Sequence, residues 1–245
     1  MTFQTTRWSL VLRARGQGAD GTQALDQLLA AYWQPVYVFY RRLGADRDAA
    51  ADLTQGLFTD LLTRGDLADA APERGRFRAF LRTCARHWWT NERARALAHK
   101  RGGGAAMLPL QPDDAEAWLG AEPVDADSAD ALFERRWATT VLDRAVWQLE
   151  QEELAAGRRA QFAVLRQCLD GSPPPRPWAE LAAELATTEG ALKVAAHRLK
   201  ARFRACVVTE VHETLPDGCA PGEELQELLA ALQRRTGRGI SPDSR

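Results

Sequence analysis

The chain has 245 residues, of which 45% are hydrophobic and 27% are charged, and its net charge is −1. This composition is typical of a globular protein with one large or two modest domains. The four cysteines form no CxxC pair, and no histidine spacing indicates a metal site, so we expect small buried thiols. The first residues lack the apolar segment of a secretion signal, and no run of about 20 apolar residues follows. We therefore expect a cytoplasmic protein that does not enter a membrane.

Helical periodicity extends over most of the chain, and the two-residue alternation of strands is absent. The predicted fold class is all-α, with two helical domains joined by an acidic flexible linker. After an N-terminal segment at 1–21, residues 22–101 form the first domain. Its predicted helices are Thr22 to Leu43, Arg47 to Arg64 and Arg76 to Lys100. Residues 102–130 contain seven acids and no Lys or Arg, show no periodicity, and are predicted to be the linker.

The last predicted helix of the first domain is strongly basic and aromatic. Gly75 to Arg101 has eight Lys or Arg against a single acid, a net charge of +7. On a helical wheel, one face is apolar and contains Phe77, Phe80, Leu81, Cys84 and Trp88. A second face contains Arg78, Arg82, Arg86, Trp89 and Arg93. Cations attract phosphate and aromatic rings stack on unpaired bases, so this face is a candidate nucleic-acid surface. The alternative is a solvated basic face on which Trp89 rests against arginine stems.

Residues 131–215 are predicted to form the second domain. Its predicted helices are Ala131 to Leu154, Arg158 to Leu169, Pro177 to Leu185 and Glu189 to Glu213. The last two have the pattern of a helix-turn-helix, in which Thr187 or Thr188 can cap the second helix. The apolar face of that helix contains Leu192, Ala196, Leu199 and Phe203. Its cationic face contains Lys193, His197, Lys200 and Arg204. Such a face can enter a DNA major groove; the alternative is a surface helix whose cations suit its C-terminus.

The C-terminal extension, 216–245, contains one short amphipathic segment, Glu223 to Arg234. Its apolar face contains Leu225, Leu228, Leu229 and Leu232. We expect this face to pack within the chain, against the second domain. The alternative is that it binds a regulatory protein.

The order of these parts resembles the extracytoplasmic-function sigma factors of bacterial RNA polymerase, in the subset with a short C-terminal helical extension. The resemblance covers about Ala24 to Leu215. Residues 22–101 are similar to sigma region 2, in which a polymerase-docking helix precedes the helix that reads and melts the minus-ten element; the FRAFL sequence at 77–81 matches the start of that second helix. Residues 131–215 are similar to the helix-turn-helix of region 4, because EGALKVAAHRLKARFR at 189–204 matches the reader of the minus-thirty-five element.

The resemblance implies three groups of contact residues. The core-polymerase contacts are Asp52, Leu53, Gln55 and Phe58. The minus-ten DNA contacts are Glu73, Arg74, Arg78, Arg82, Arg86, Trp89, Asn91 and Arg93. The minus-thirty-five DNA contacts are Thr188, Glu189, Lys193, His197, Lys200 and Arg204.

The resemblance also implies a function and partners. The chain would be a sigma initiation factor that binds core RNA polymerase, directs it to specific promoters and assists DNA melting. Its partners would be the clamp helices of the largest catalytic subunit, the flap region, promoter DNA, and an anti-sigma or other regulatory protein. No active site, cofactor, metal or small-molecule substrate is expected. The acidic linker would mimic nucleic acid in the polymerase cleft; the alternative is that it adds solubility.

Three features depart from the family pattern. Val194 and Ala195 stand where Ser and Arg are common in the recognition helix, and the Pro-rich segment 171–177 is longer than usual. Gly56 stands where Glu is common in the docking helix, at a cost in helix propensity of about 1 kcal/mol relative to Ala. Because Val194 and Ala195 replace the common Ser and Arg, direct base readout by the recognition helix is expected to be reduced.

Two other functions are consistent with parts of the sequence. A helix-turn-helix regulator that does not bind polymerase would explain the second domain, but neither the docking helix nor the basic aromatic helix. An enzyme would use Cys84, His87 and His99 with nearby acids. It is disfavoured because no second cluster supplies a base, metal ligands or a phosphate-binding glycine loop.

Overall fold

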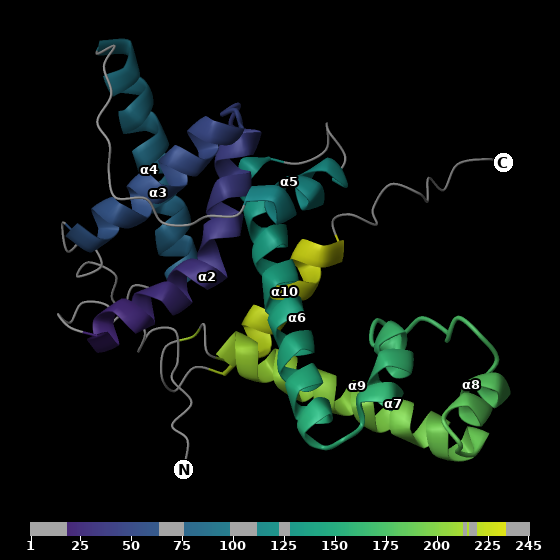
Figure 1. Cartoon of the computed structure of the whole chain (residues 1–245). Helices are drawn as coiled ribbons and strands as arrows, with labels where there is room; N and C mark the ends of the chain where they lie inside the picture. The colour runs from purple at the N-terminus through teal and green to yellow at the C-terminus, as the bar shows by residue number, and fades with distance from the viewer. Residues whose placement is uncertain are drawn as a thin grey trace, which may run out of the picture. The chain divides into compact units, whose positions relative to one another are not determined.

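The computed structural model describes residues 19–63, 76–98, 112–122, 128–212, 215 and 220–233 (Figure 1). Within these ranges the regular structure is helical throughout, which confirms the predicted all-α class. The helices are α2 (Ala19–Arg42), α3 (Arg47–Thr63), α4 (Phe77–Ala98), α5 (Pro112–Gly120), α6 (Ala129–Ala155), α7 (Arg159–Leu165), the 3₁₀-helix η3 (Arg166–Cys168), α8 (Trp178–Glu184), α9 (Glu189–His212) and α10 (Gly222–Gln233). Of the candidate site residues named above, Glu73, Arg74 and His99 lie outside the described residues, as do the predicted helix ends at Arg64, Lys100, Glu213 and Arg234.

The chain divides into two compact units. Among the described residues, the first unit comprises those up to 140 and from 212 onward, and the second comprises 141–211. The start of α6 and all of α10 therefore belong with α2 to α5. The sequence pattern instead predicted a boundary at 131. It also favoured packing of the Glu223 to Arg234 segment on the second domain, and for the described helix α10 this expectation is corrected.

The core of the first unit is built around the second half of α2. This stretch is buried on every side of the helix, so other elements must surround it. Helices α3, α4 and α5 all pack on α2. Aromatic rings also contact α2 from α4 and from the start of α6: Phe77 of α4 meets Tyr32 edge-on with centroids 5.2 Å apart, and Phe133 of α6 meets Phe39 at 6.4 Å. The fully buried residues of α2 include Tyr32, Val36, Tyr37, Val38, Phe39 and Tyr40.

Helix α5 replaces part of the predicted flexible linker. It begins with Pro112 and carries two aspartates in its first turn, both of which favour a helix start. Its Glu116 accepts hydrogen bonds from the Tyr37 hydroxyl at 2.5 Å and from Arg41 Nε at 2.5 Å. The guanidinium of Arg41 holds the pKa of the Glu116 carboxyl below its usual value. Residues 112–120 are therefore a docked element of the first unit.

The second unit contains the second half of α6 together with α7, η3, α8 and most of α9. Helices α6 and α9 run antiparallel, since Arg144 pairs with Glu210 at 2.9 Å and Arg202 pairs with Glu152 at 2.6 Å. Each of its four α-helices contributes apolar side chains to one core. These side chains include Val141, Ala145, Leu149, Phe162, Leu165, Leu181, Leu192 and Leu199.

Candidate nucleic-acid interfaces

Helices α8 and α9 are joined by a turn that uses a left-handed residue. Ala186 has φ 48°, a conformation that costs a non-glycine residue about 1–2 kcal/mol. Two hydrogen bonds close the end of α8 around it: the Ala186 amide donates to the Ala183 carbonyl at 3.2 Å, and the Thr187 amide donates to Ala182 at 2.9 Å. This arrangement turns the chain within four residues, as a helix-turn-helix requires.

Thr188 begins the second helix of the motif. Its Oγ1 accepts a hydrogen bond from the Ala191 amide at 3.2 Å, and its carbonyl accepts one from the Leu192 amide at 3.0 Å. These are the contacts of an N-cap residue. The sequence left the cap open between Thr187 and Thr188, and the structure assigns it to Thr188.

Helix α9 has distinct buried and cationic faces. The predicted apolar face is confirmed at Leu192, Ala196 and Leu199, which are buried against the rest of the second unit. Lys193 is exposed and pairs with Glu189 at 2.6 Å, one helical turn earlier. Of the other residues that the resemblance implies for minus-thirty-five DNA, Thr188, His197 and Arg204 are exposed and Lys200 is half-buried.

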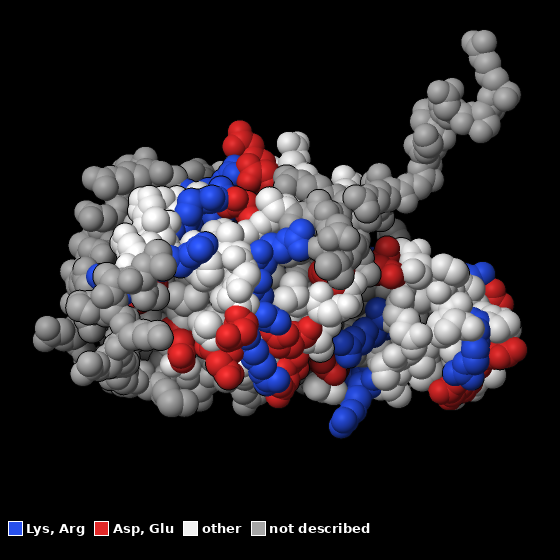
Figure 2. Space-filling model, turned by 90° about the horizontal axis from the view of Figure 1, so that it is seen from above, with Lys and Arg blue, Asp and Glu red and all other residues white. Residues whose placement is uncertain are grey.

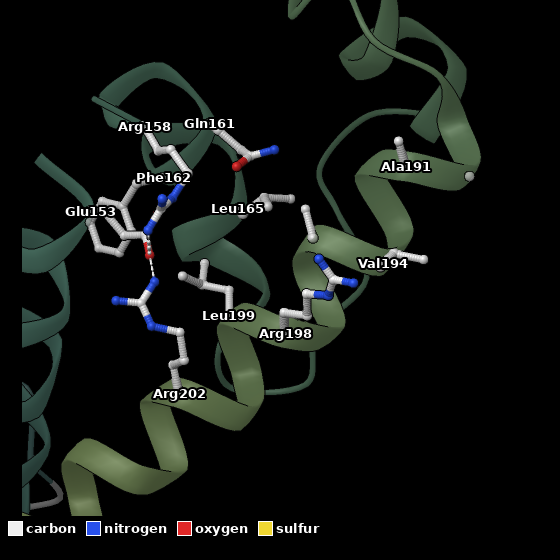
Figure 3. Close-up of a pocket in the computed structure, with 12 residues that line it drawn as sticks. Glu153, Arg158, Gln161, Phe162, Leu165, Ala191, Val194, Arg198, Leu199 and Arg202 are labelled. Atoms are coloured by element: carbon white, nitrogen blue, oxygen red, sulfur yellow. Dashed lines mark hydrogen bonds and ion pairs between the residues drawn. The ribbon is translucent and has the colours of Figure 1, made fainter. Parts of the chain in front are cut away.

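A hollow of about 540 Å³ lies between α7 and α9 in the second unit (Figure 3). Its wall on α9 carries Val194 and Arg198, both exposed to solvent, with Val194 at 50%. Arg158 and Arg202 also line it, and both pair with Glu153, which lies between them. Arg198 therefore adds an exposed cation on the side of α9 that lines the hollow, away from the Lys193 face, and the sequence interpretation missed it. The sequence analysis considered only the face with Lys193, His197, Lys200 and Arg204. Arg198 follows Lys193 by five residues and therefore lies on a different face of the helix.

The docking residues implied on α3 differ in exposure. Asp52 is exposed, Leu53 and Gln55 are half-buried, and Phe58 is buried in the first unit. Phe58 lies on the face of α3 that also buries Ala50, Thr54, Leu57 and Leu61. In this structure only the first three present surface to a partner, and Phe58 acts as a core residue that supports the helix.

Gly56 of α3 lies directly against Trp88 of α4. A Cβ atom at this position would be 2.9 Å from Trp88 Cζ2, closer than carbon atoms pack. The glycine that departs from the family pattern thus allows close packing of α3 on α4. Trp88 is half-buried there, which agrees with its predicted place on the apolar face.

The N-terminal half of α4 presents its arginines to acids of the same unit. Arg78 is only 5% exposed: Nε donates to Glu224 at 2.8 Å, further nitrogens pair with Glu134 and Glu227, and the guanidinium lies 4.2 Å from the centroid of the Trp137 ring. Burial lowers the pKa of Arg78, but the surrounding carboxylates outweigh this effect and raise it. The expectation of an exposed position for Arg78 is corrected.

Arg82 and Arg86 of α4 also form ion pairs, with acids at the start of α6. Arg82 donates to Glu134 at 2.6 Å, and Arg86 donates to Asp130 at 2.5 Å. Acidic and basic side chains are likewise intermingled on the face shown in Figure 2. The basic face of α4 is therefore largely neutralised in its N-terminal half.

The C-terminal half of α4 is more open. Asn91 and Arg93 are exposed. Trp89 is half-buried, stacks on Tyr40 with centroids 6.1 Å apart, and lies 5.5 Å from the Arg93 guanidinium. Arg93 is therefore accessible to nucleic acid, whereas one face of the Trp89 ring is already covered by Tyr40 of α2.

Among the described residues, no group of His, Cys, Asp and Glu is arranged to hold a metal ion. None of the described helices is long and apolar enough to cross a membrane. Comparison of the chain with protein-family models, with curated proteins and with solved structures gave no match.

Proposed function

We propose that this protein is a transcription initiation factor of the extracytoplasmic-function sigma type. It binds core RNA polymerase, directs it to promoters and assists melting. The observation that carries the proposal is the α8–α9 motif, with its tight turn, its Thr188 cap and the cationic face that begins at Lys193. In this proposal α2 to α4 form sigma region 2, and the second unit forms the core of region 4.

The chemistry of α9 supports the DNA-reading part. Lys193, His197 and Arg204 are exposed donors that can reach phosphates or base edges in a major groove. Arg198 adds a guanidinium that can bind guanine with two hydrogen bonds, and the exposed Val194 offers an apolar contact to a thymine methyl group. The recognition helix can thus read bases although it lacks the usual Ser and Arg.

The surface of α3 supports the polymerase-binding part. Asp52 is exposed beside half-buried Leu53 and Gln55, so this face combines a charge, an amide and an apolar side chain. Phe58 and Gly56 hold the helix from inside through the unit core and through Trp88. We propose that this face docks on the clamp helices of the largest catalytic subunit, and that phosphodiester synthesis belongs to the polymerase alone.

Run-off transcription tests the proposal. Core polymerase is mixed with the full chain and a template library randomised at the two promoter elements, and transcripts are sequenced. We expect enrichment of one two-part sequence only when the chain is present. Failure of the chain to bind core polymerase, even at low salt, would refute the proposal.

Variants separate the two surfaces. Lys193→Gln together with Arg198→Gln should lose promoter enrichment while binding to core polymerase persists, because the changes lie on α9. Gln55→Ala with Asp52→Ala should weaken binding to core polymerase while DNA binding persists. Arg159→Gln removes an exposed cation from α7 and serves as the matched control.

A helix-turn-helix regulator that does not bind polymerase is the second candidate. It is favoured by the internal pairing of Arg78, Arg82 and Arg86, which leaves less of α4 for nucleic acid. This candidate predicts sequence-specific DNA binding by the chain without any complex with core polymerase. The same experiment therefore distinguishes the two.

A further inference from the structure

Helix α10 binds the arginines at the start of α4 with a set of carboxylates. Arg78 donates hydrogen bonds to the Glu224 carboxylate from Nε at 2.8 Å and from Nη2 at 3.1 Å. Arg76 gives Nε to Glu224 at 2.7 Å and reaches Glu223 at 3.4 Å. Glu227 pairs with both arginines. Three acids of one short helix thus occupy two neighbouring guanidinium groups.

The contact is buried at its centre, where Glu224 meets Arg78, and exposed at Glu223 and Glu227. Glu224 is 1% exposed, and it shares this buried position with Leu228 and Ala231 on the same side of α10. A bidentate carboxylate on a guanidinium is the same geometry that a phosphate adopts on arginine. Each nitrogen of Arg78 that faces α10 is therefore taken by an oxygen that a phosphate would otherwise supply.

We propose that α10 is an autoinhibitory helix that occupies Arg78 of α4 and Arg76, which directly precedes α4, in place of nucleic-acid phosphate. This inference rests on the proposed function, because α10 would regulate the DNA-binding surface that α4 has in that function. In the closed form, which is the structure described above, α10 pairs with Arg76 and Arg78. In the open form α10 has dissociated from α4, and nucleic acid binds there. Arg76 joins the nucleic-acid surface in this open form, although the sequence interpretation did not include it.

Charge and packing give two independent ways to open the contact. Glu224→Gln with Glu227→Gln removes two of the three carboxylate charges but keeps the shape of α10. Leu228→Asp with Ala231→Asp places charges on the buried side of α10 and displaces the helix while leaving its glutamates intact. The matched control is Glu184→Gln, which removes an acid from the exposed pair with Arg176 in the second unit. It reproduces the loss of one negative charge without touching α10.

The experiment measures binding of the full chain to a labelled single-stranded oligonucleotide by fluorescence anisotropy. Hydrogen exchange of the α10 amides reports whether the helix has left. We expect both double variants to bind about tenfold more tightly, as follows if about a tenth of the parent protein is open. Their affinity should also fall more steeply with salt, because more phosphates are contacted. Glu184→Gln should bind like the parent, and Arg76→Gln with Arg78→Gln should abolish the gain of the displaced variant.

The inference is overturned if α10 amides exchange freely in a variant whose oligonucleotide affinity equals that of the parent. If both double variants fail to fold, Glu227→Gln alone removes a half-exposed carboxylate and must give a smaller gain; no gain in the folded single variant also overturns the inference. Binding to core polymerase is measured in parallel. If neither the parent nor any variant binds core polymerase, the proposed function is refuted. The oligonucleotide data would still decide the role of α10.

Discussion

Replacing Gly56 by Ala tests whether α3 packs on α4 as closely as described. Helix propensity alone predicts stabilisation of about 1 kcal/mol. The added Cβ, however, would lie 2.9 Å from Trp88 Cζ2. Forcing an extra methyl group into packed side chains costs about 1–3 kcal/mol. Because the half-buried ring of Trp88 lies directly against α3, we expect the overlap to prevail and the free energy of unfolding to fall by about 1 kcal/mol.

Urea unfolding followed by circular dichroism measures this change, and a double-mutant cycle assigns it. In a Trp88→Leu background the overlap is gone, so Gly56→Ala should become stabilising, with a coupling energy of at least about 1 kcal/mol. The matched control is Gly190→Ala in α9, where a Cβ meets no atom within 4 Å. This control should lose no stability. A gain of stability from Gly56→Ala in the parent chain would refute the close approach.

Three further changes test other parts of the fold. Ala186→Gly should raise the free energy of unfolding by about 0.5–1 kcal/mol, because glycine adopts the left-handed turn without strain, whereas Ala183→Gly inside α8 should lower it by about 1 kcal/mol; equal effects in urea unfolding would contradict the turn. Thr188→Ala should cost about 1 kcal/mol through loss of the cap on α9, and hydrogen exchange of the Ala191 amide should speed up; unchanged exchange would argue against the cap. Glu116→Gln should cost about 1.5 kcal/mol at neutral pH through the lost charged hydrogen bonds. Because the folded-state pKa of Glu116 lies below its unfolded value of 4.5, its contribution is full above that pH and is lost as the pH falls further, so the difference between the two proteins should shrink on acidification; a difference independent of pH would contradict the α5 contact.

Local patterns predicted the elements that depend on neighbouring residues. The α8–α9 motif follows from apolar side chains repeated at helical spacing and from a threonine at the start of α9, and both are contained within about 30 residues. The burial of Leu192, Ala196 and Leu199 was predicted for the same reason. The periodicity of a helix fixes which residues share a face, and that information is present in the sequence.

The contacts of α4 could not be predicted in this way. Periodicity places Arg78 on a face with Arg82 but does not show what that face meets. The partners of Arg78 lie 56 residues away at Glu134 and 146 residues away at Glu224. A basic face opposite distant acids therefore looks the same in sequence as a basic face opposite solvent.

Two other features needed the tertiary structure for similar reasons. Helix α5 is short and follows a stretch without periodicity, and its place is set by Glu116 on Tyr37, 79 residues earlier. Gly56 was interpreted as a loss of helix propensity because its neighbour Trp88 belongs to another helix. The role of a small residue depends on what approaches it, which the sequence does not state.

Promoter opening is the step that the proposed function requires of this chain, and permanganate reactivity of thymines measures it. A promoter fragment selected by the run-off experiment is treated in the presence of core polymerase, the full chain, or both. We predict unpaired thymines around the minus-ten element only when both proteins are present, and loss of this reactivity when Lys193 and Arg198 are both replaced by Gln. Thymines that remain paired in the complete mixture, although core polymerase and the chain are both bound, would show that the protein does not assist melting.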